Sequence, residues 1–503
     1  MPEQPQTLST QQALDLALQH HRAGRLPQAE SIYKQILQGD PNQPVVLQLL
    51  GVSAHQLGNN DVAVDLITKA LALEPEYPEA HNNLGLALQG LGKPDDAVNS
   101  YRKALAIRPD YADAHNNLGN ALQVLGEFED SVSSYRKAVK YNPDYAMAHN
   151  NLGNALQELG KVKEAEASYQ RALSIEADYA DAHNNLGNAL RRLDKLEEAV
   201  ASYRRALALN TDHARAHCNL GEALRDQAYK KRQNNESKYF YASGNKSLLD
   251  KSEKDELWDD VLACANKVLS NKSNDTAGLA LKTAALISLN RLDDWGVLCD
   301  FDRLIQIQDM SVPVGYEDLR IFNEALLSRC ASDENPTFEA PGKSIKKGKR
   351  INLLHKDPSP GPVSSLLEFV NKSATRYRVE HPVDPRHPYL ALSPSTWRIN
   401  AWGSILGKQG FHESHIHRSG WLSGVYYSRL PDVMKTDNEK WEGCIEFGRP
   451  RNYVDDGNSP EFHLVRPREG LMILFPSYFY HQTVPFESDG TRFTVSFDLI
   501  PFS

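Results

Sequence analysis

The chain has 503 residues with 41% apolar and 24% charged side chains, and its formal net charge is −9. A chain of this length should hold roughly two to four domains, each large enough for its own hydrophobic core. The negative charge gives no general attraction to nucleic acid or to anionic membranes, so we expect neither as a partner.

The first residues, Met-Pro-Glu-Gln-Pro-Gln-Thr, are polar and lack the basic and apolar regions of a secretory signal peptide. No run of about eighteen apolar residues is present to span a bilayer. The five cysteines are scattered, odd in number and without CxxC spacing. This usage predicts reduced thiols in a cytoplasmic protein and excludes a cysteine-based zinc cluster.

The N-terminal half contains an internal repeat. The motif Ala-His-Asn-Asn-Leu-Gly recurs at residues 80–85, 114–119, 148–153 and 182–187, which gives a period of 34 residues. Each of these units also carries a tyrosine at a fixed offset from the glycine, and the first two carry a proline, Pro109 and Pro143. The small glycine lets two antiparallel helices approach closely, the tyrosine fills the gap toward the next unit, and the proline ends the second helix.

This pattern resembles the tetratricopeptide repeat, a pair of antiparallel helices. We expect units at 10–43, 44–77, 78–111, 112–145, 146–179 and 180–213, and the first helix of a seventh from 214. The resemblance implies an all-α solenoid over residues 10–227, in which about six and a half 34-residue repeats stack into a right-handed superhelix with a concave groove.

One position of the repeat goes beyond packing. The sixth residue of each unit from 78 onward is an asparagine, namely Asn83, Asn117, Asn151, Asn185 and Asn219. An asparagine amide can donate to a backbone carbonyl and accept from a backbone N–H at the same time. In tetratricopeptide arrays this part of the helix lines the concave surface, so the resemblance implies a groove that binds a protein or peptide. The alternative is that the asparagines were copied when the repeats were duplicated and have no role in binding, that is, they are consensus filler.

The middle of the chain is less regular. The repeat frame breaks after Asp226, and the polar, charged residues 228–254 predict an inserted loop or a solvated helix extension. Helical spacing returns over 255–310, so we predict an irregular helical insert with capping helices across 228–330. Residues 331–350 carry Pro, Gly and a basic cluster, and we predict a solvated linker there.

From residue 351 the composition changes to short β-rich segments separated by Gly, Pro, Asp and Asn. The predicted strands include 389–392, 397–402, 424–427, 444–447, 462–465, 471–475 and 492–497. So many short strands in a domain spanning 351–503 predict a sandwich or jelly roll. The whole chain is therefore expected to be multidomain, with an all-α repeat superhelix followed by a double-stranded β-helix.

Histidines cluster between two of these strands. His412, His415 and His417 fall within six residues. If this stretch is a strand, Glu413, His415 and His417 share one face, because side chains alternate with period two. Two imidazoles two residues apart on one face make half of a metal site. The other half is expected from His481, which follows the apolar strand 471–475.

A histidine pair, the distal His481 and Arg492 on the last strand together resemble the Fe(II)/2-oxoglutarate-dependent dioxygenases, in particular the prolyl-hydroxylase-like branch. The resemblance covers about residues 380–503 and implies that His415 and His481 ligate Fe(II). It implies that 2-oxoglutarate is gripped by Arg492, which suits bidentate pairing with a carboxylate. The further cosubstrate contacts that it implies are a hydroxyl from Thr494 and a pocket wall from Tyr426 or Tyr427.

This sequence departs from the family at one position. The family usually has His-x-Asp/Glu followed by a distal histidine, whereas His417 stands here in place of the acid. Three arrangements are open: a three-histidine site that includes His417, a two-histidine site with water as third ligand, or a shifted pair that uses His412 or Glu413.

Three functional hypotheses follow. The first is a dioxygenase, a hydroxylase in outcome, that acts on a protein or peptide recruited by the repeat groove. The second is an oxygenase that acts on a small molecule, with the repeats used for assembly only. The third is a non-enzymatic repeat scaffold with an inactive cupin-like domain, and the intact His415, His481 and Arg492 count against it.

Overall fold

The computed structural model describes residues 9–242, 252–331, 337–338, 345–353, 361–434, 441–453, 460–488 and 490–502. Its internal contacts divide the chain between Thr211 and Asp212 into two units. The boundary lies before the predicted end of the solenoid at residue 227. The reason is that the helix starting at Ala214 runs on without interruption to Ala242 and packs against the helices that follow it.

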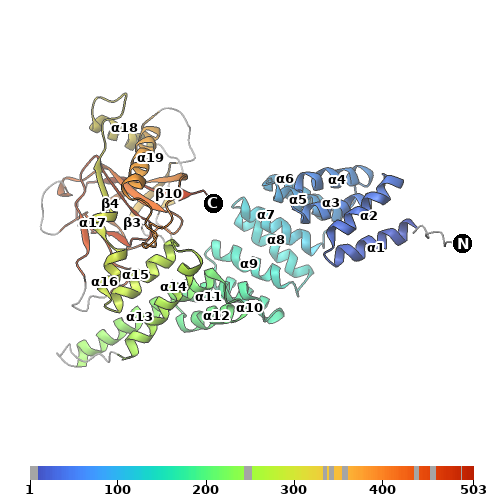
Figure 1. Cartoon of the computed structure of the whole chain (residues 1–503), viewed down its shortest axis with the longest axis horizontal. Coiled ribbons are helices and arrows are strands. Elements are labelled where there is room, and N and C mark those ends of the chain that lie inside the picture. Colours follow the sequence, from blue (N-terminus) through green and yellow to red (C-terminus); the bar gives the residue numbers. More distant parts are fainter. Residues whose placement is uncertain are drawn as a thin grey trace. The chain divides into compact units, whose positions relative to one another are not determined.

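The first unit consists of antiparallel helix pairs (Figure 1). Among its described residues the helices are α1 (Thr10–Arg22), α2 (Leu26–Gly39), α3 (Pro44–Gln56), α4 (Asn60–Leu73), α5 (Pro78–Gly90), α6 (Pro94–Ile107), α7 (Ala112–Val124), α8 (Phe128–Tyr141), α9 (Ala146–Glu158), α10 (Val162–Ile175), α11 (Ala180–Arg192) and α12 (Leu196–Leu209). The first helix of each pair begins at the first residue of a predicted unit. The expected repeat fold is therefore present.

The close approach within each pair depends on the motif glycine. A methyl group on Gly153 would lie 2.5 Å from Cε1 of Tyr169, whose side chain is completely buried. Gly85, Gly119 and Gly187 meet their own tyrosines in the same way. The glycine and the tyrosine thus form one packing unit, as the sequence period indicates.

Replacing Gly153 by alanine is expected to lower the free energy of unfolding by about 1–3 kcal/mol, because the buried ring of Tyr169 has no room to move. Gly39→Ala is the matched control, since nothing lies within 4 Å of its methyl position. Urea unfolding followed by circular dichroism measures both. Equal midpoints for the two variants would contradict the packing argument.

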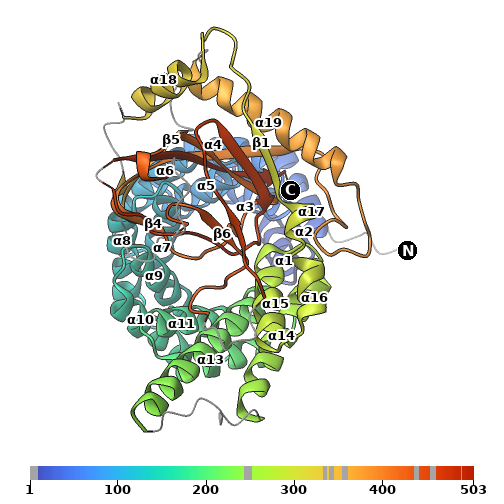
Figure 2. The same cartoon turned by 90° about the vertical axis from the view of Figure 1, so that its left-hand side faces the viewer.

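The second unit begins with helices and continues as a β-rich domain. Its described helices are α13 (Ala214–Ala242), α14 (Ser252–Asn271), α15 (Thr276–Ser288), α16 (Leu292–Leu298), α17 (Phe301–Leu304), α18 (Leu319–Ala331) and α19 (Pro362–Glu380), with a 3-10 turn η1 (Asp432–Met434). Of the predicted insert, residues 228–242 extend α13, and 243–251 lie outside the described residues. Helix α19 was not expected from the sequence; Figure 2 shows it with α18 beside the sheet.

The strands form two antiparallel sheets. They are β1 (Gln306–Asp309), β2 (Thr337–Phe338), β3 (Ile345–Asn352), β4 (Trp397–His412), β5 (Leu422–Arg429), β6 (Ile445–Phe447), β7 (His463–Val465), β8 (Leu471–Pro476), β9 (His481–Thr483) and β10 (Arg492–Pro501). One sheet has the order β1-β8-β5-β10-β4-β3-β2 and the other the order β7-β6-β9. Phe447 of the small sheet packs edge-on against Phe475 of the large one, 4.9 Å between ring centroids. This confirms the jelly roll.

Two predictions for this domain were wrong. Residues 345–350, predicted as part of a linker, belong to β3, which pairs with β4 from Ile345 opposite His412 to Asn352 opposite Trp402. The linker prediction was wrong because the lysines of this segment suggested a solvated loop. Lysines are also common on edge strands, and the two-residue strand β2 leaves most of β3 at the edge of the sheet. Residues 389–392, predicted as a strand, form turns between Pro388 and Pro394.

Candidate metal centre

Three histidines converge where the two sheets meet. One ring nitrogen from each of His415, His417 and His481 lies within 4.8 Å of the others. His415 and His417 follow β4, which ends at His412, so the prediction of a ligand strand over 413–417 was wrong. The backbone is nevertheless fixed by an isolated bridge: the N–H of His415 donates to the carbonyl of His481 and the reverse bond is also present, each 3.1 Å long.

The hydrogen bonds of the three rings decide which nitrogen is free. Nδ1 of His415 lies 2.7 Å from the carbonyl oxygen of Glu413, and Nδ1 of His481 lies 3.0 Å from that of Phe479. A carbonyl oxygen can only accept, so each Nδ1 carries the hydrogen. Nε2 therefore holds the lone pair in both rings. Fixing the outer nitrogen in this way is what proteins do with histidines that bind metals.

The outer nitrogen of His417 is held by a carboxylate. Its Nδ1 lies 2.7 Å from Oδ1 of Asp498, and its Nε2 lies 3.3 Å from Nε2 of His481. Asp498 also accepts from the hydroxyl of Ser423 at 2.7 Å. Asp498 was not predicted from the sequence. The period of two along β10 was the signal that could have found it, because Asp498 continues the face of Arg492 and Thr494.

Burial keeps the rings of His415 and His481 uncharged. Removal from water, followed by repulsion from His417, lowers the pKa of His415 to about 3. Burial, together with His415 and His417, also lowers the pKa of His481 well below its ordinary value. A neutral imidazole is the form that binds a metal. The rings are thus ready to bind at neutral pH without first losing a proton.

The geometry fits one metal ion. Nitrogen ligands that each lie about 2 Å from one ion are at most about 4 Å apart. Nε2 of His417 and Nε2 of His481 are already 3.3 Å apart, and because all three ligand atoms lie within 4.8 Å of one another, small side-chain rotations would let them share one ion. Among the described residues, no other group of three potential ligands gathers in this way. Glu413 instead pairs with Arg451 at 2.9 Å, and Nδ1 of His412 lies 3.4 Å from the hydroxyl of Thr483. The structure therefore favours the three-histidine arrangement over the shifted pair.

A buried cation lies in the same fold. Arg492 is 2% exposed; its Nη1 donates to the carbonyl of Gly443 at 3.4 Å, and its Nε has no hydrogen-bond partner among the described residues. The hydroxyls of Tyr427 and Ser404 are buried and unpartnered too. Because unpaired buried donors are costly, three of them together indicate a site for an acceptor that carries negative charge.

The strand register explains how these groups meet. Thr494 on β10 pairs with Ser404 on β4 and with Tyr427 on β5, so the three form one row across the sheet. Ser404 was not predicted from the sequence. Burial raises the pKa of Tyr427 to about 12, so its phenol is a hydrogen-bond donor at neutral pH. Tyr426 points elsewhere: its hydroxyl donates to Oδ1 of Asn323 at 2.7 Å, and the structure does not bring it to Arg492.

The repeat asparagines bond to one another. Nδ2 of Asn117 donates to Oδ1 of Asn82 at 3.0 Å, and Nδ2 of Asn151 donates to Oδ1 of Asn116 at 3.1 Å. Asn185 bonds to the preceding repeat in the same way. Part of the hydrogen-bonding capacity expected for a peptide therefore joins neighbouring repeats. Asn83, Asn117, Asn151, Asn185 and Asn219 nevertheless remain half-buried rather than buried.

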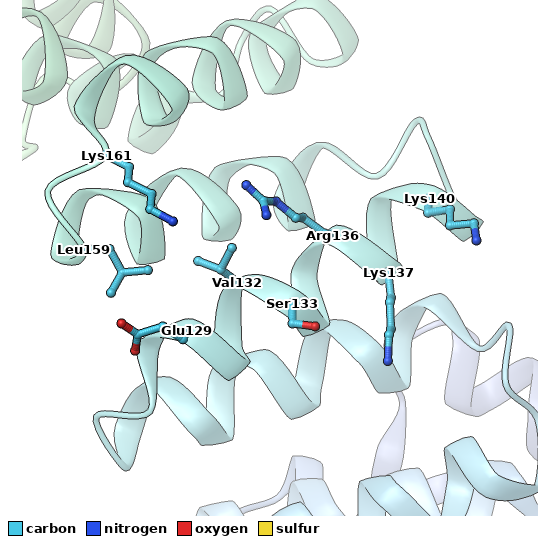
Figure 3. A pocket seen from close by; sticks show the side chains of 8 residues that line it. All are labelled: Glu129, Val132, Ser133, Arg136, Lys137, Lys140, Leu159 and Lys161. Carbon is cyan, nitrogen blue, oxygen red and sulfur yellow. The ribbon is translucent and has the colours of Figure 1, made fainter.

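A shallow hollow of about 360 Å³ lies in the first unit between α8 and the turn after α9 (Figure 3). Four of its eight lining side chains are basic, but Arg136 is already paired with Glu164 at 2.8 Å. The lining contains no histidine or cysteine, so the hollow offers no second metal centre.

Family profiles match both halves of the chain. Residues 400–498 match the family described as "Putative 2OG-Fe(II) oxygenase". Tetratricopeptide-repeat profiles match residues 11–35, 51–92, 90–126, 116–183 and 187–227. The chain thus joins tetratricopeptide repeats to a 2OG-Fe(II) oxygenase domain. Among curated proteins no relative is found. In the described residues, no helix combines the length and the apolarity needed to cross a membrane.

Several solved repeat structures are similar to part of the chain. MamA from Desulfovibrio magneticus has 20% identity and a TM-score of 0.32, covering 34% of this chain and 96% of its own. YrrB, described as a repeat protein with an unusual peptide-binding site, has 20% identity and a TM-score of 0.32, covering 37% and 95%. A repeat protein of Thermus thermophilus has 24% identity and a TM-score of 0.32, covering 36% and 99%.

Proposed function

We propose that this chain, which joins tetratricopeptide repeats to a 2OG-Fe(II) oxygenase domain, is an Fe(II)/2-oxoglutarate-dependent dioxygenase that hydroxylates a protein or peptide. The observation that carries the proposal is the convergence of His415, His417 and His481, each with Nδ1 held by an oxygen acceptor. The buried Arg492, with an unpartnered Nε, supports it independently.

Different residues of the chain would hold the two cofactors. The free ring nitrogens of His415, His417 and His481 would hold Fe(II). Arg492 would pair with the distal carboxylate of 2-oxoglutarate through its planar guanidinium, assisted by the hydroxyls of Tyr427, Thr494 and Ser404. When bound, the cofactors supply an oxidative decarboxylation that yields succinate and CO₂ and oxidises a C–H bond of the substrate.

The protein environment suits this chemistry. Three neutral imidazoles leave the charge of Fe(II) uncompensated, which favours binding of an anionic cosubstrate in a site of low dielectric. Asp498 restores one negative charge beside His417 and fixes the orientation of its ring. The rings of Phe447 and Phe475 lie near His481, with centroids 6.1 and 4.7 Å away, and keep water from that side of the centre.

Uncoupled turnover tests the proposal directly. Purified protein with Fe(II), 2-oxoglutarate and O₂ should form succinate even without a substrate. Anaerobic addition of 2-oxoglutarate to the Fe(II) form should produce a metal-to-ligand charge-transfer band. The absence of both would remove the dioxygenase proposal and leave a repeat scaffold with an inactive cupin-like domain.

The protein or peptide substrate is inferred from the half-exposed asparagines along the repeats. An asparagine amide has two N–H groups and two acceptor sites. Asn117 donates one inter-repeat bond and Asn151 donates two, to Asn116 and Asn120, so Asn117 keeps an N–H and both keep acceptor capacity for a peptide backbone. A second candidate is a small-molecule substrate with the repeats used for assembly, which the inter-repeat bonds of Asn117 and Asn151 favour.

A pair of double variants separates the two candidates. Asn117→Ala with Asn151→Ala should lower the capture of protein substrates about 30-fold, because two amides that each contribute about 1 kcal/mol are removed. Succinate formation without substrate should be unchanged. The control is Asn82→Ala with Asn116→Ala, which removes the buried inter-repeat acceptors and leaves the exposed amides in place.

Substrates would be captured from lysate with the His481→Ala variant and identified by the mass of one added oxygen after treatment with wild-type enzyme. Equal loss of capture in the two double variants would assign the asparagines a packing role only. Unchanged capture in both would restore their interpretation as consensus filler.

A further inference from the structure

Two short segments carry the ligands, and helices of the same unit hold both of them. We name residues 415–420 the first ligand segment and residues 477–481 the second. Thr276 at the start of α15 donates to the carbonyl of Gly420 at 3.0 Å, and the hydroxyl of Tyr478 donates to the carbonyl of Leu298 at the end of α16. Phe479 packs edge-on against Phe301 of α17.

Helix α13 makes the two charged contacts. Glu222 forms an ion pair with Arg418, the residue after the ligand His417. Arg225 donates through Nη1 to the hydroxyl of Tyr480, the residue before the ligand His481, at 2.9 Å. Glu222 and Arg225 are three residues apart, so they lie on one face of the helix. Glu222 is 3% exposed, and its carboxylate is therefore committed to this contact region rather than to solvent.

The repeat register shows that these two positions are special. They lie one and four residues after the glycine of the repeat motif. In earlier repeats the same positions bond to the tyrosine of the second helix: the hydroxyl of Tyr135 donates to Asn120 at 2.6 Å and to Gln123 at 3.1 Å. The hydroxyl of Tyr169 likewise donates to Asn154 at 2.7 Å, and it accepts from Nε2 of Gln157 at 2.8 Å.

The second position is already charged in the sixth unit, as Arg191, and in the seventh unit both positions are charged, as Glu222 and Arg225. The phenol that bonds to Arg225 comes from Tyr480 of the second ligand segment. The change from asparagine to glutamate at the first position thus coincides with a change of partner at both positions, from the repeat itself to the two ligand segments. Consensus filler does not account for this coincidence, since the surrounding motif Ala-His-Cys-Asn-Leu-Gly is otherwise kept.

We propose that α13 is a positioning element of the metal centre, in which Glu222 and Arg225 fix the two ligand segments relative to each other. The consequence for catalysis rests on the proposed function, but the positioning itself does not. The first helix of the seventh repeat therefore serves as the outer support of the oxygenase site. The chain continues from the repeat motif into this support without a linker, because Gly221 is followed directly by Glu222.

Amide hydrogen exchange on the full-length, metal-free protein tests the positioning. Reporters are the N–H of His481, bonded to His415, and the N–H of His417, bonded to the carbonyl of Ser477 at 3.0 Å. Glu222→Gln and Tyr480→Phe should each speed exchange in peptides covering both segments about tenfold, because charge-assisted bonds are lost. Tyr169→Phe, which removes the equivalent hydroxyl of an earlier repeat, should leave both peptides unchanged.

Co(II) titration of the same proteins gives a second readout. Affinity should fall about tenfold in Glu222→Gln and Tyr480→Phe and stay at the wild-type value in Tyr169→Phe. Unchanged exchange in both folded variants would overturn the positioning role, whatever the metal data show. If the wild type binds neither Co(II) nor 2-oxoglutarate but exchange is accelerated, the proposed function fails and the positioning stands. Should Glu222→Gln not fold, the nearly isosteric Tyr480→Phe decides.

Discussion

The His481→Ala variant is expected to lose Fe(II) binding, with an affinity reduced by more than the 10–100-fold typical of changes to residues that only orient a ligand. The ring of His481 is at the centre of the proposed site, since its Nε2 lies 3.3 Å from that of His417 and its ring centroid lies 4.3 Å from that of His415. Anaerobic titration with Fe(II), or with Co(II) as a spectroscopic substitute, measures the loss.

His412→Ala is the matched control for this variant. His412 is a neighbouring histidine whose ring centroid lies 6.1 Å from that of His415, but it is outside the group of three. Its replacement should leave metal affinity near the wild-type value. If His412→Ala abolished binding and His481→Ala did not, the ligand pair would be the shifted one that the sequence left open.

His417 decides between the two remaining arrangements. If His417 is a ligand, its replacement by alanine should reduce metal affinity about as much as the replacement of His481. If water is the third ligand and His417 only orients the site, the loss should stay within about 10–100-fold. The bond to Asp498 supports the first alternative, since a carboxylate on the outer nitrogen raises the basicity of an imidazole toward a metal. Asp498 would then act on the metal through the ring of His417, whereas the acid of the usual triad binds the metal directly.

Much of the fold followed from periodicity. The 34-residue repeat set the start of every helix pair, because four of the units pack the same glycine on the same tyrosine and the others keep their frame. The alternation along β10 placed Arg492 and Thr494 on one face, as the structure has them. His415 and His481 were paired in the sequence analysis through a family resemblance, and the backbone bridge between them provides the physical contact.

Other features depend on contacts that no local pattern encodes. The segment at His415 is held by an isolated bridge to His481 of β9 and not by a continuous ladder of hydrogen bonds. Its alternating residues therefore led to a wrong strand prediction. Glu222 and Arg225 lie near the end of the repeat frame, where charged residues are ordinary. Only their contacts with Arg418 and Tyr480 show that they hold the two ligand segments. Ser404 has no signal in sequence, because its place beside Thr494 comes from the pairing register of β4 and β10.

The Arg492→Met variant is expected to keep metal binding and to lose about 100-fold in affinity for 2-oxoglutarate. Methionine fills similar space but removes a guanidinium whose charge-assisted bonds contribute about 1.5–3 kcal/mol. Titration of 2-oxoglutarate into the anaerobic Fe(II) or Co(II) form measures the loss, and metal titration confirms that the centre is intact.

Two further variants show how Arg492 would act. Arg492→Lys keeps the charge without the planar fork and should fall between wild type and Arg492→Met. Tyr427→Phe should weaken 2-oxoglutarate binding by about tenfold, since one unpartnered buried hydroxyl is removed. Because the pKa of Tyr427 is raised to about 12, the wild-type phenol stays protonated and the effect of Tyr427→Phe should be the same at pH values of about 6 to 9.

An Arg492→Met protein with wild-type affinity for 2-oxoglutarate would show that the buried arginine serves packing and that the carboxylate is bound elsewhere.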